Sequence, residues 1–214
     1  MSQTTYRSDI RTEVRDNIQE ASGVTGAIWS DALLNRHITR EIRSLPKKNI
    51  YREETWTQTL DPTQDYTSGI VLPDGTEKVE SVEKNDGTST YPDWNEFKGC
   101  DFYSGALFLP TRTMTSTEIR VKIKKAFTVP TDDVVALDIP DDMCEVLVWG
   151  VVIRAYRILI GYLRSSTSWD SVTKPGDLQI TVIQSWLRDA KKEYQDLVQQ
   201  YAFSPRPRDI DLVN

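Results

Sequence analysis

Residues 118–163 read EIRVKIKKAFTVPTDDVVALDIPDDMCEVLVWGVVIRAYRILIGYL, and this stretch decides the fold. It opens on strict alternation of branched apolar and charged residues at 119–124, which predicts a strand with one wet face. Pro140 then suits the first turn of a helix, because that position needs no backbone amide. From 143 to 163 nearly every residue is apolar. The stretch therefore predicts a half-buried strand followed by a long, deeply buried helix.

The helix predicted over residues 143–163 has more apolar surface than we expect other helices of the chain to cover. Its length suits a membrane span, yet it contains Arg154 and Arg157, and a charge near the middle of a span costs roughly 2.5 to 3.5 kcal/mol. We therefore expect no membrane span, and contact with further copies of the chain instead. The expected contact residues combine apolar positions with an arginine stripe at helical spacing: Trp149, Val152, Arg154, Arg157 and Arg164.

Two shorter helices are predicted near the N-terminus. Apolar residues at steps of three and four indicate an amphipathic first helix over residues 8–21. Ser30 is a good N-cap for the second helix, and Trp29 before it can fold over Leu34 as a hydrophobic staple. Pro46 ends this second helix.

The sequence changes character after the second helix, because Thr, Gly, Asp and Pro interrupt short runs and no helical periodicity persists. Residues 51–139 therefore predict an antiparallel β insertion, with a hairpin turn at the Asn-Asp-Gly of residues 85–87. The candidate strands are residues 53–60, 69–72, 78–84, 102–109 and 118–124.

A fourth helix is predicted from a cap at Asp177 to about residue 201, with apolar residues at heptad spacing. Such a seam fits either a contact within the chain or an interface between copies. Two prolines after it exclude further helix. Residues 202–214 are then either a frayed terminus or an extended segment that adds a strand or fills a groove on a partner.

The fold class that follows is α+β. Residues 1–50 and 140–201 are expected to pack together as a four-helix bundle, from which residues 51–139 project as the β insertion. Residues 202–214 form an extended C-terminal tail in this prediction. A chain of 214 residues is long enough to bury a core of this kind.

The composition of the chain disfavours several classes of function. The formal net charge of -6 gives no general attraction to nucleic acid, which disfavours a DNA-wrapping role. Cys100 and Cys144 lack metal or redox spacing, which predicts reduced thiols, and the polar N-terminus predicts a cytosolic origin. His37, the only histidine, is expected at a surface or boundary. Because the sequence contains no catalytic, phosphate-binding or metal-binding spacing, we expect no enzyme, no metal and no cofactor.

Several features of the sequence occur in the same order in a known protein family. A tryptophan-led helix at Trp29-Ser30-Asp31 is followed, much later, by the run 120–128 and the loop Val129-Pro130-Thr131-Asp132-Asp133. Leu137-Asp138-Ile139-Pro140-Asp141-Asp142 then opens the apolar helix. In this order the chain resembles the head-to-tail adaptor (connector) proteins of tailed bacteriophages. The resemblance spans most of the chain and is one of pattern, not of a diagnostic motif.

The resemblance implies a structural virion protein at the head-tail junction, made in the cytoplasm of the bacterial host. It implies a homo-oligomeric ring, commonly of twelve copies, that joins the portal protein to the next tail or nozzle protein around the channel for genome ejection. DNA would pass through this channel without sequence-specific binding. By the same resemblance the C-terminal tail docks on the portal. The residues concerned are Phe203, Pro205, Arg206, Pro207, Ile210, Leu212 and Val213.

Two other functions stay open from the sequence. A cellular binding module would recognise a protein or glycan with an exposed aromatic patch around Tyr91, Trp94 and Phe97 of the β insertion. A small hydrolase or transferase would assemble its site from dispersed carboxylates and tyrosines. That enzyme needs a pocket in which strongly shifted titratable groups converge.

Overall fold

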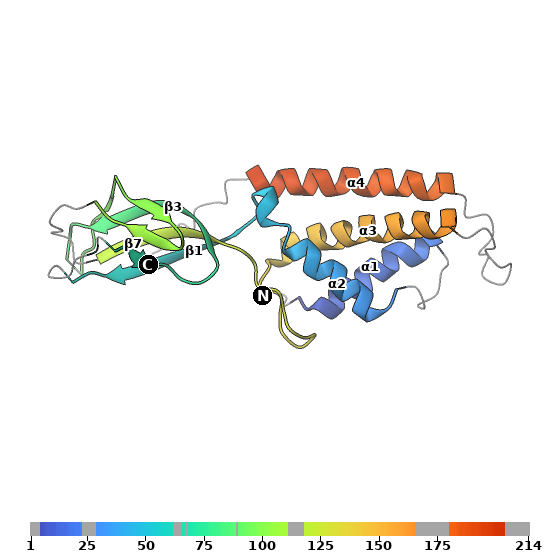
Figure 1. The fold of residues 1–214 in the computed structure, drawn as a ribbon, viewed down its shortest axis with the longest axis horizontal. Coiled ribbons are helices and arrows are strands. Elements are labelled where there is room, and N and C mark those ends of the chain that lie inside the picture. The colour runs from blue at the N-terminus through green and yellow to red at the C-terminus, as the bar shows by residue number, and fades with distance from the viewer. Residues whose placement is uncertain are drawn as a thin grey trace. The chain divides into compact units, whose positions relative to one another are not determined.

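The computed structural model of the chain is an α+β fold whose described residues form four α-helices and two antiparallel sheets (Figure 1). The chain divides into two compact units, each with its own hydrophobic core. We call Met1–Ile50 with Phe127–Asn214 the helical unit and Tyr51–Ala126 the β unit. The residues that the structure describes are 5–22, 29–61, 66, 68–88, 90–110, 118–165 and 180–203.

Helices of two kinds build the helical unit. The four α-helices share one core, and two single turns of 3-10 helix, η1 and η2, adjoin α2 and α3. The two N-terminal helices lie where the sequence predicts them, within one or two residues at their starts. In chain order the elements are α1 (Arg7–Ser22), α2 (Asp31–Ile42), η1 (Pro46–Lys48), η2 (Asp141–Met143), α3 (Cys144–Ser165) and α4 (Ile180–Phe203).

The start of α2 follows from its capping residues. Ser30 has an extended backbone, and its hydroxyl accepts a hydrogen bond from the amide of Leu33 at 3.3 Å. Trp29 before the cap is buried in the same core as Leu34 on the first turn. The predicted N-cap is therefore confirmed, and the side chains that a staple would join share one core.

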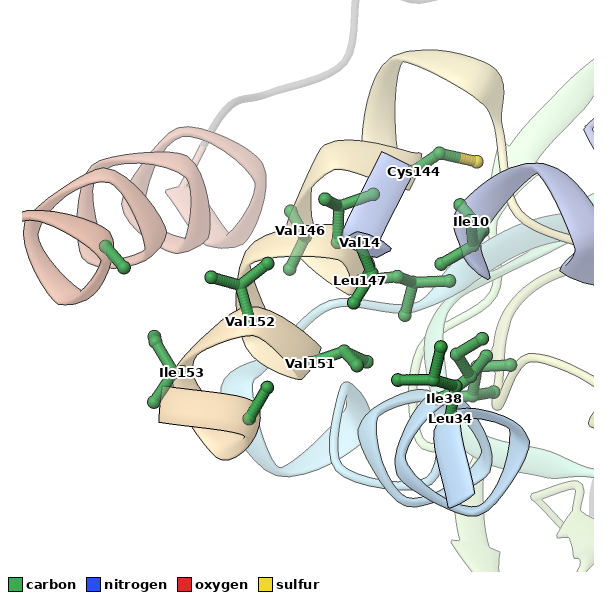
Figure 2. Close-up of a cluster of buried hydrophobic side chains, with 14 of the residues drawn as sticks. Ile10, Val14, Leu34, Ile38, Cys144, Val146, Leu147, Val151, Val152 and Ile153 are labelled. Atoms are coloured by element: carbon green, nitrogen blue, oxygen red, sulfur yellow. The ribbon is translucent and has the colours of Figure 1, made fainter. Parts of the chain in front are cut away.

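Helix α3 is the centre of the helical unit, because α1, α2 and α4 all pack against it. In Figure 2, Val151 points toward Leu34 and Ile38 of α2, whereas Ile153 points away from them. A single chain thus covers most of α3, since α1 and α2 lie on one side of it and α4 on another (Figure 1). Our expectation that its apolar surface needs further copies is wrong. Its buried residues include Val146, Leu147, Val148, Val151, Val152, Ala155, Tyr156 and Leu159.

Helices α2 and α3 approach closely where Glu41 faces Gly150. Glu41 is only 2% exposed. A Cβ atom built on Gly150 would lie 2.5 Å from Cδ and 2.7 Å from Cγ of Glu41. Only glycine leaves room for the carboxylate at this crossing.

Residues 127–139 belong to the helical unit, although the sequence analysis assigns them to the β insertion. Phe127 and Leu137 are buried in the helical core. The amide of Leu137 donates to the carbonyl of Thr5 at 2.9 Å, which fixes this segment against the N-terminal end of α1. The few apolar residues of the loop therefore decide its unit, and they show no periodicity that the sequence analysis could use.

Seven strands form the β unit, as far as the structure describes it. The larger sheet has the order β1-β7-β3-β4 and the smaller one β2-β6-β5, with every pair antiparallel. The strands are β1 (Arg52–Thr59), β2 (Ile70–Val71), β3 (Thr76–Asn85), β4 (Trp94–Glu96), β5 (Asp101–Tyr103), β6 (Ala106–Phe108) and β7 (Glu118–Lys125).

The alternation predicted for residues 118–124 is confirmed in β7. The apolar side chains of this strand are buried in the core of the β unit, and the charged ones lie on the opposite face. On that face Arg120 pairs with Glu83 of β3 at 2.6 Å and lies 4.5 Å from the ring centroid of Trp94. One face of the larger sheet is thus apolar and the other is covered by ion pairs.

The single strand predicted over residues 102–109 is wrong, because a tight turn divides it into β5 and β6. Ser104 and Gly105 both have positive φ, 52° and 78°, as a two-residue hairpin turn of the primed type requires. At residues 85–87 the amide of Gly87 donates a hydrogen bond of 2.9 Å to Oδ1 of Asn85, but the tight hairpin turn predicted there is wrong, because residues 86–93 separate β3 from its partner β4. Strand β4 is too short for its alternation to stand out in the sequence.

The last described helix, α4, ends at Phe203, so Ala202 and Phe203 are helical and do not begin an extended tail. The rest of the predicted tail, residues 204–214, and the predicted cap Asp177 lie outside the described residues. Among the helices described, none has both the length and the apolar content that crossing a membrane requires.

Replacing Gly150 with alanine is expected to lower the free energy of unfolding by about 1–3 kcal/mol, because the added methyl group overlaps the buried carboxylate of Glu41. The matched control is Gly161→Ala on the same helix, where an added Cβ meets no atom within 4 Å. Alanine favours helix there, so this variant is expected to gain up to about 1 kcal/mol. Urea denaturation followed by circular dichroism measures both. Equal shifts in the two variants would contradict the steric account.

Candidate functional site

A cluster of titratable side chains surrounds Glu41 in the helical unit. Lys48 and Tyr194 both donate hydrogen bonds to Oε1 of Glu41, and Arg154 donates to Oε2 at 3.0 Å. The ammonium group of Lys48 also lies 4.7 Å from the ring centroid of Tyr194. The three donors come from η1, α4 and α3. Glu41 therefore joins α2 to three other elements.

The electrostatics of this cluster favour a structural role. Burial alone would raise the pKa of Glu41, but hydrogen bonds from Lys48, Tyr194 and Arg154 outweigh it and hold the pKa below its ordinary value. Burial, together with the hydrogen bond to Glu41, raises the pKa of Tyr194, so the phenol keeps its proton. A carboxylate that is ionised, hydrogen-bonded and 2% exposed has no access to a substrate. Perturbed pKa values here mark a structural ion-pair network.

His37 lies one turn before Glu41 on α2 and is buried, with 6% exposure, whereas the sequence analysis places it at a surface or boundary. Neither ring nitrogen has a hydrogen-bond partner among the described residues. Burial, and next the nearby charge of Arg154, lowers the pKa of His37. The imidazole is therefore neutral near pH 7 and packs as a core side chain.

A second polar cluster fixes the loop that precedes α3. The carboxylate of Asp133 accepts a hydrogen bond from Nε of Arg7 at 3.1 Å and another from Nη1 of Arg11 at 2.7 Å. Both arginines belong to α1, and both are buried. Their hydrogen bonds and charges, with that of Arg11 first, lower the pKa of Asp133. We call these three residues the Asp133 latch.

The latch adjoins two exposed valines. Oδ1 of Asp132 accepts hydrogen bonds from the amides of Val134 and Val135 at 3.0 and 3.1 Å. Val134 is 82% exposed and Val135 is 43% exposed. The loop thus combines an ordered backbone with an apolar surface, a feature that the sequence analysis missed. We call Val134 and Val135 the valine tip.

The five contact residues predicted on the long helix do not form one surface. Val152 is fully buried within the chain and is not available for contact. Arg154 takes part in the cluster around the buried carboxylate. Trp149 is partly buried and Arg157 is exposed, so these two reach the surface. The side chain of Arg164 lies outside the described residues.

The residues predicted to bind the portal are described only at the backbone of Phe203, the last residue of α4. The others, Pro205, Arg206, Pro207, Ile210, Leu212 and Val213, lie outside the described residues.

The aromatic patch predicted around residue 91 is not brought together. Tyr91 is 80% exposed, but Trp94 lies beneath the guanidinium group of Arg120 and Phe97 packs against the core of the β unit. Only one of the three aromatic rings is therefore presented to a partner.

The smaller sheet instead exposes an apolar row that the sequence analysis missed. Val71 of β2 and Tyr103 of β5 are both paired with Ala106 of β6, so the three side chains share one face. Val71 is 79% exposed and Tyr103 is 75% exposed. The strands involved are two or three residues long, which is too short for periodicity to reveal this face.

A cavity of about 320 Å³ lies in the β unit, and the Glu41 cluster belongs to the other unit. None of the residues that line the cavity takes part in the Glu41 cluster. Within the ranges that the structure describes, no three His, Cys, Asp or Glu side chains gather as metal ligands would. The cavity is lined by Gln58, Thr59, Asp61, Tyr66, Ser68, Gly69, Ile70 and Val71.

Comparison with known proteins gives similarity to solved structures only. No protein-family model and no curated protein matches the chain. Among solved structures, the chain is similar to one described as "Neck of empty GTA particle computed with C6 symmetry". The TM-score is 0.29 at 13% sequence identity, and the alignment covers 87% of this chain and 93% of that chain. At this TM-score the two structures share too little to transfer a role.

Acid is expected to destabilise the helical unit through His37. Its pKa in the folded chain is lowered from about 6.5, so the unfolded chain binds this proton more readily. The contribution of His37 to the free energy of unfolding is complete above about pH 6.5 and is lost as the pH falls through the folded pKa, by at most about 1.4 kcal/mol per pH unit.

His37→Leu removes the titration and is expected to flatten the dependence of unfolding free energy on pH between pH 5.5 and 7.5, measured by urea denaturation. His37 is the only histidine of the chain, so no second imidazole masks the result. An unchanged slope in the variant would assign the acid sensitivity to other groups.

Proposed function

We propose that the chain is a non-enzymatic structural protein of a tailed-bacteriophage virion, joining the portal to the tail at the head-tail junction. In this proposal identical copies, twelve by the resemblance to connector proteins, form a ring around the channel through which the genome leaves. The ring holds the portal on one side and the next tail or nozzle protein on the other.

The observation that carries the proposal is the division of the chain into two units with separate cores. An adaptor has to hold two different partners at the same time. Because each unit buries its own apolar residues, each can keep its surface fixed while the other unit is engaged. Helices interrupted by a β insertion are also the architecture that the resemblance implies.

The residues behind the resemblance have physical roles in this fold. Ser30 caps α2, and Asp133 fixes the loop before α3. Pro140 precedes the single 3-10 turn that leads into α3, with the amide of Met143 donating to its carbonyl at 2.9 Å. The shared pattern thus marks positions where the backbone changes direction.

The charge of the chain fits a passage for DNA. With a formal net charge of -6, a ring of such chains repels the phosphate backbone overall. DNA that is not bound moves through without pausing, which suits ejection. In this proposal residues 204–214, which follow α4, dock on the portal, and the β unit faces the next tail component.

The test is assembly with the portal protein encoded in the same genome. Full-length chain is expected to bind portal rings in a fixed number of copies, counted by native mass spectrometry. A chain ending at Phe203 retains every described helix and is expected to unfold at the same temperature within about 2 °C, yet to lose portal binding.

A full-length chain that stays monomeric at high concentration and binds no portal ring would overturn the proposal. If the shortened chain binds the portal fully, residues 204–214 are not the portal-binding segment, and the proposed ring is not contradicted. The comparison of unfolding temperatures shows whether the shortened chain is still folded, so that a loss of binding cannot be due to unfolding.

A second candidate is a cellular binding module that uses the β unit, favoured by exposed Val71 and Tyr103, which both pair with Ala106. This module predicts a stable monomer whose binding survives removal of residues 204–214. Replacing Tyr103 with Ser is then expected to weaken its binding. The portal assay above separates the two functions, because only the adaptor recruits several copies to one ring.

A further inference from the structure

The valine tip is an apolar surface that the fold holds in place. Two buried arginines of α1 bind Asp133, and Asp132 holds the amides of both valines. Val134 is nevertheless 82% exposed. Holding an exposed valine in place buries no apolar surface within its own chain, so this order does not stabilise the fold through the valine. A partner that binds a pre-ordered tip is spared the entropy cost of ordering it, which is how preorganised contacts gain affinity.

Helix α3 leaves one row of side chains partly uncovered. The row follows steps of four along the helix, so successive members are neighbours, and the row winds around the helix by about 40° at each step. Ile153, in the middle of the row, points away from Leu34 and Ile38 of α2 (Figure 2) but is itself buried, with 7% exposure. Trp149 is half-buried, and three members are exposed. We call this the outer row: Glu145, Trp149, Ile153, Arg157 and Gly161.

The tip and the outer row are complementary in apolar surface and in charge. Both expose apolar side chains, the valines on one and Trp149 on the other. Asp132 at the base of the tip is acidic, whereas Arg157 supplies an exposed cation on the row. Trp149 and Arg157 are about 12 Å apart along the helix axis, within the span of a loop tip and an extended arginine side chain.

We infer that the valine tip of one copy seats on the outer row of a second copy, with the valines against Trp149 and Asp132 near Arg157. This inference rests on the proposed ring and names its contact between copies. The tip and the row are different surfaces of one unit, and the tip's loop emerges on the side of that unit away from α4 (Figure 1). Such a head-to-tail contact closes into a ring when the rotation between copies permits.

The test replaces the tip without touching the core. Val134→Asp in the full-length chain is expected to raise the concentration needed for half-maximal assembly by about ten-fold or more, because it places a charge in a desolvated contact. Arg157→Glu on the outer row is expected to act in the same direction. Val71→Asp is the matched control, because Val71 of the β unit is 79% exposed and receives the same substitution.

A second arm locates the contact by cross-linking. Chains carrying Val134→Cys are mixed with chains carrying Glu145→Cys and treated with a short bis-maleimide reagent. Linked pairs are expected only in the mixture. The native Cys100 and Cys144 react slowly, because burial raises the pKa of each thiol to about 11. Each single variant alone measures the remaining background.

The outcomes separate this inference from the proposed function. Assembly that is lost in Val134→Asp and kept in Val71→Asp, with links in the mixture, supports the contact. Complete rings in every variant, or rings that form without links, overturn the contact and leave the adaptor role standing. A tip variant that assembles normally but loses portal binding assigns the tip to the portal and also overturns the inference. Wild-type chains that bind no portal and never assemble overturn both.

Discussion

The helical unit depends on one buried carboxylate. Glu41 fits between α2 and α3 because position 150 is glycine, and it accepts hydrogen bonds from η1, α3 and α4. Burying such a group costs desolvation energy, so its net contribution to stability is small, whereas removing one partner is costly. We interpret its role as specifying a single arrangement of α4 against α3. The heptad seam of α4 would fit α3 in more than one register, and the bond from Tyr194 to Glu41 is satisfied in only one of them.

Because most of α3 is covered within one chain, the described helices share a closed core without a second copy. An interface between copies must then come from surface features of a finished unit. Interfaces of this kind are smaller and more polar than those of chains that fold together.

The sequence predicts the parts of the fold whose signals are local. The cap at Ser30 and the alternation in β7 could be predicted because both depend only on residues that are neighbours in the sequence. The turn at Ser104 was missed, because one polar residue before a glycine is a weak signal inside an apolar run. His37 was misplaced for another reason: it is buried, and α2 packs against α3, which lies far along the chain. The Glu41 cluster could not be predicted for the same reason. Its members range from residue 41 to residue 194, and their spacing in the sequence does not indicate a contact.

The chain enters and leaves the β unit through neighbouring strands. Arg52 at the start of β1 lies opposite Lys125 at the end of β7, and paired residues in an antiparallel sheet have Cα atoms about 5 Å apart. Excising the whole unit therefore leaves two ends that a short turn can bridge, without rethreading the helices. Recombination can therefore exchange the β unit as a module, so that one helical unit acquires a new binding specificity in a single genetic event.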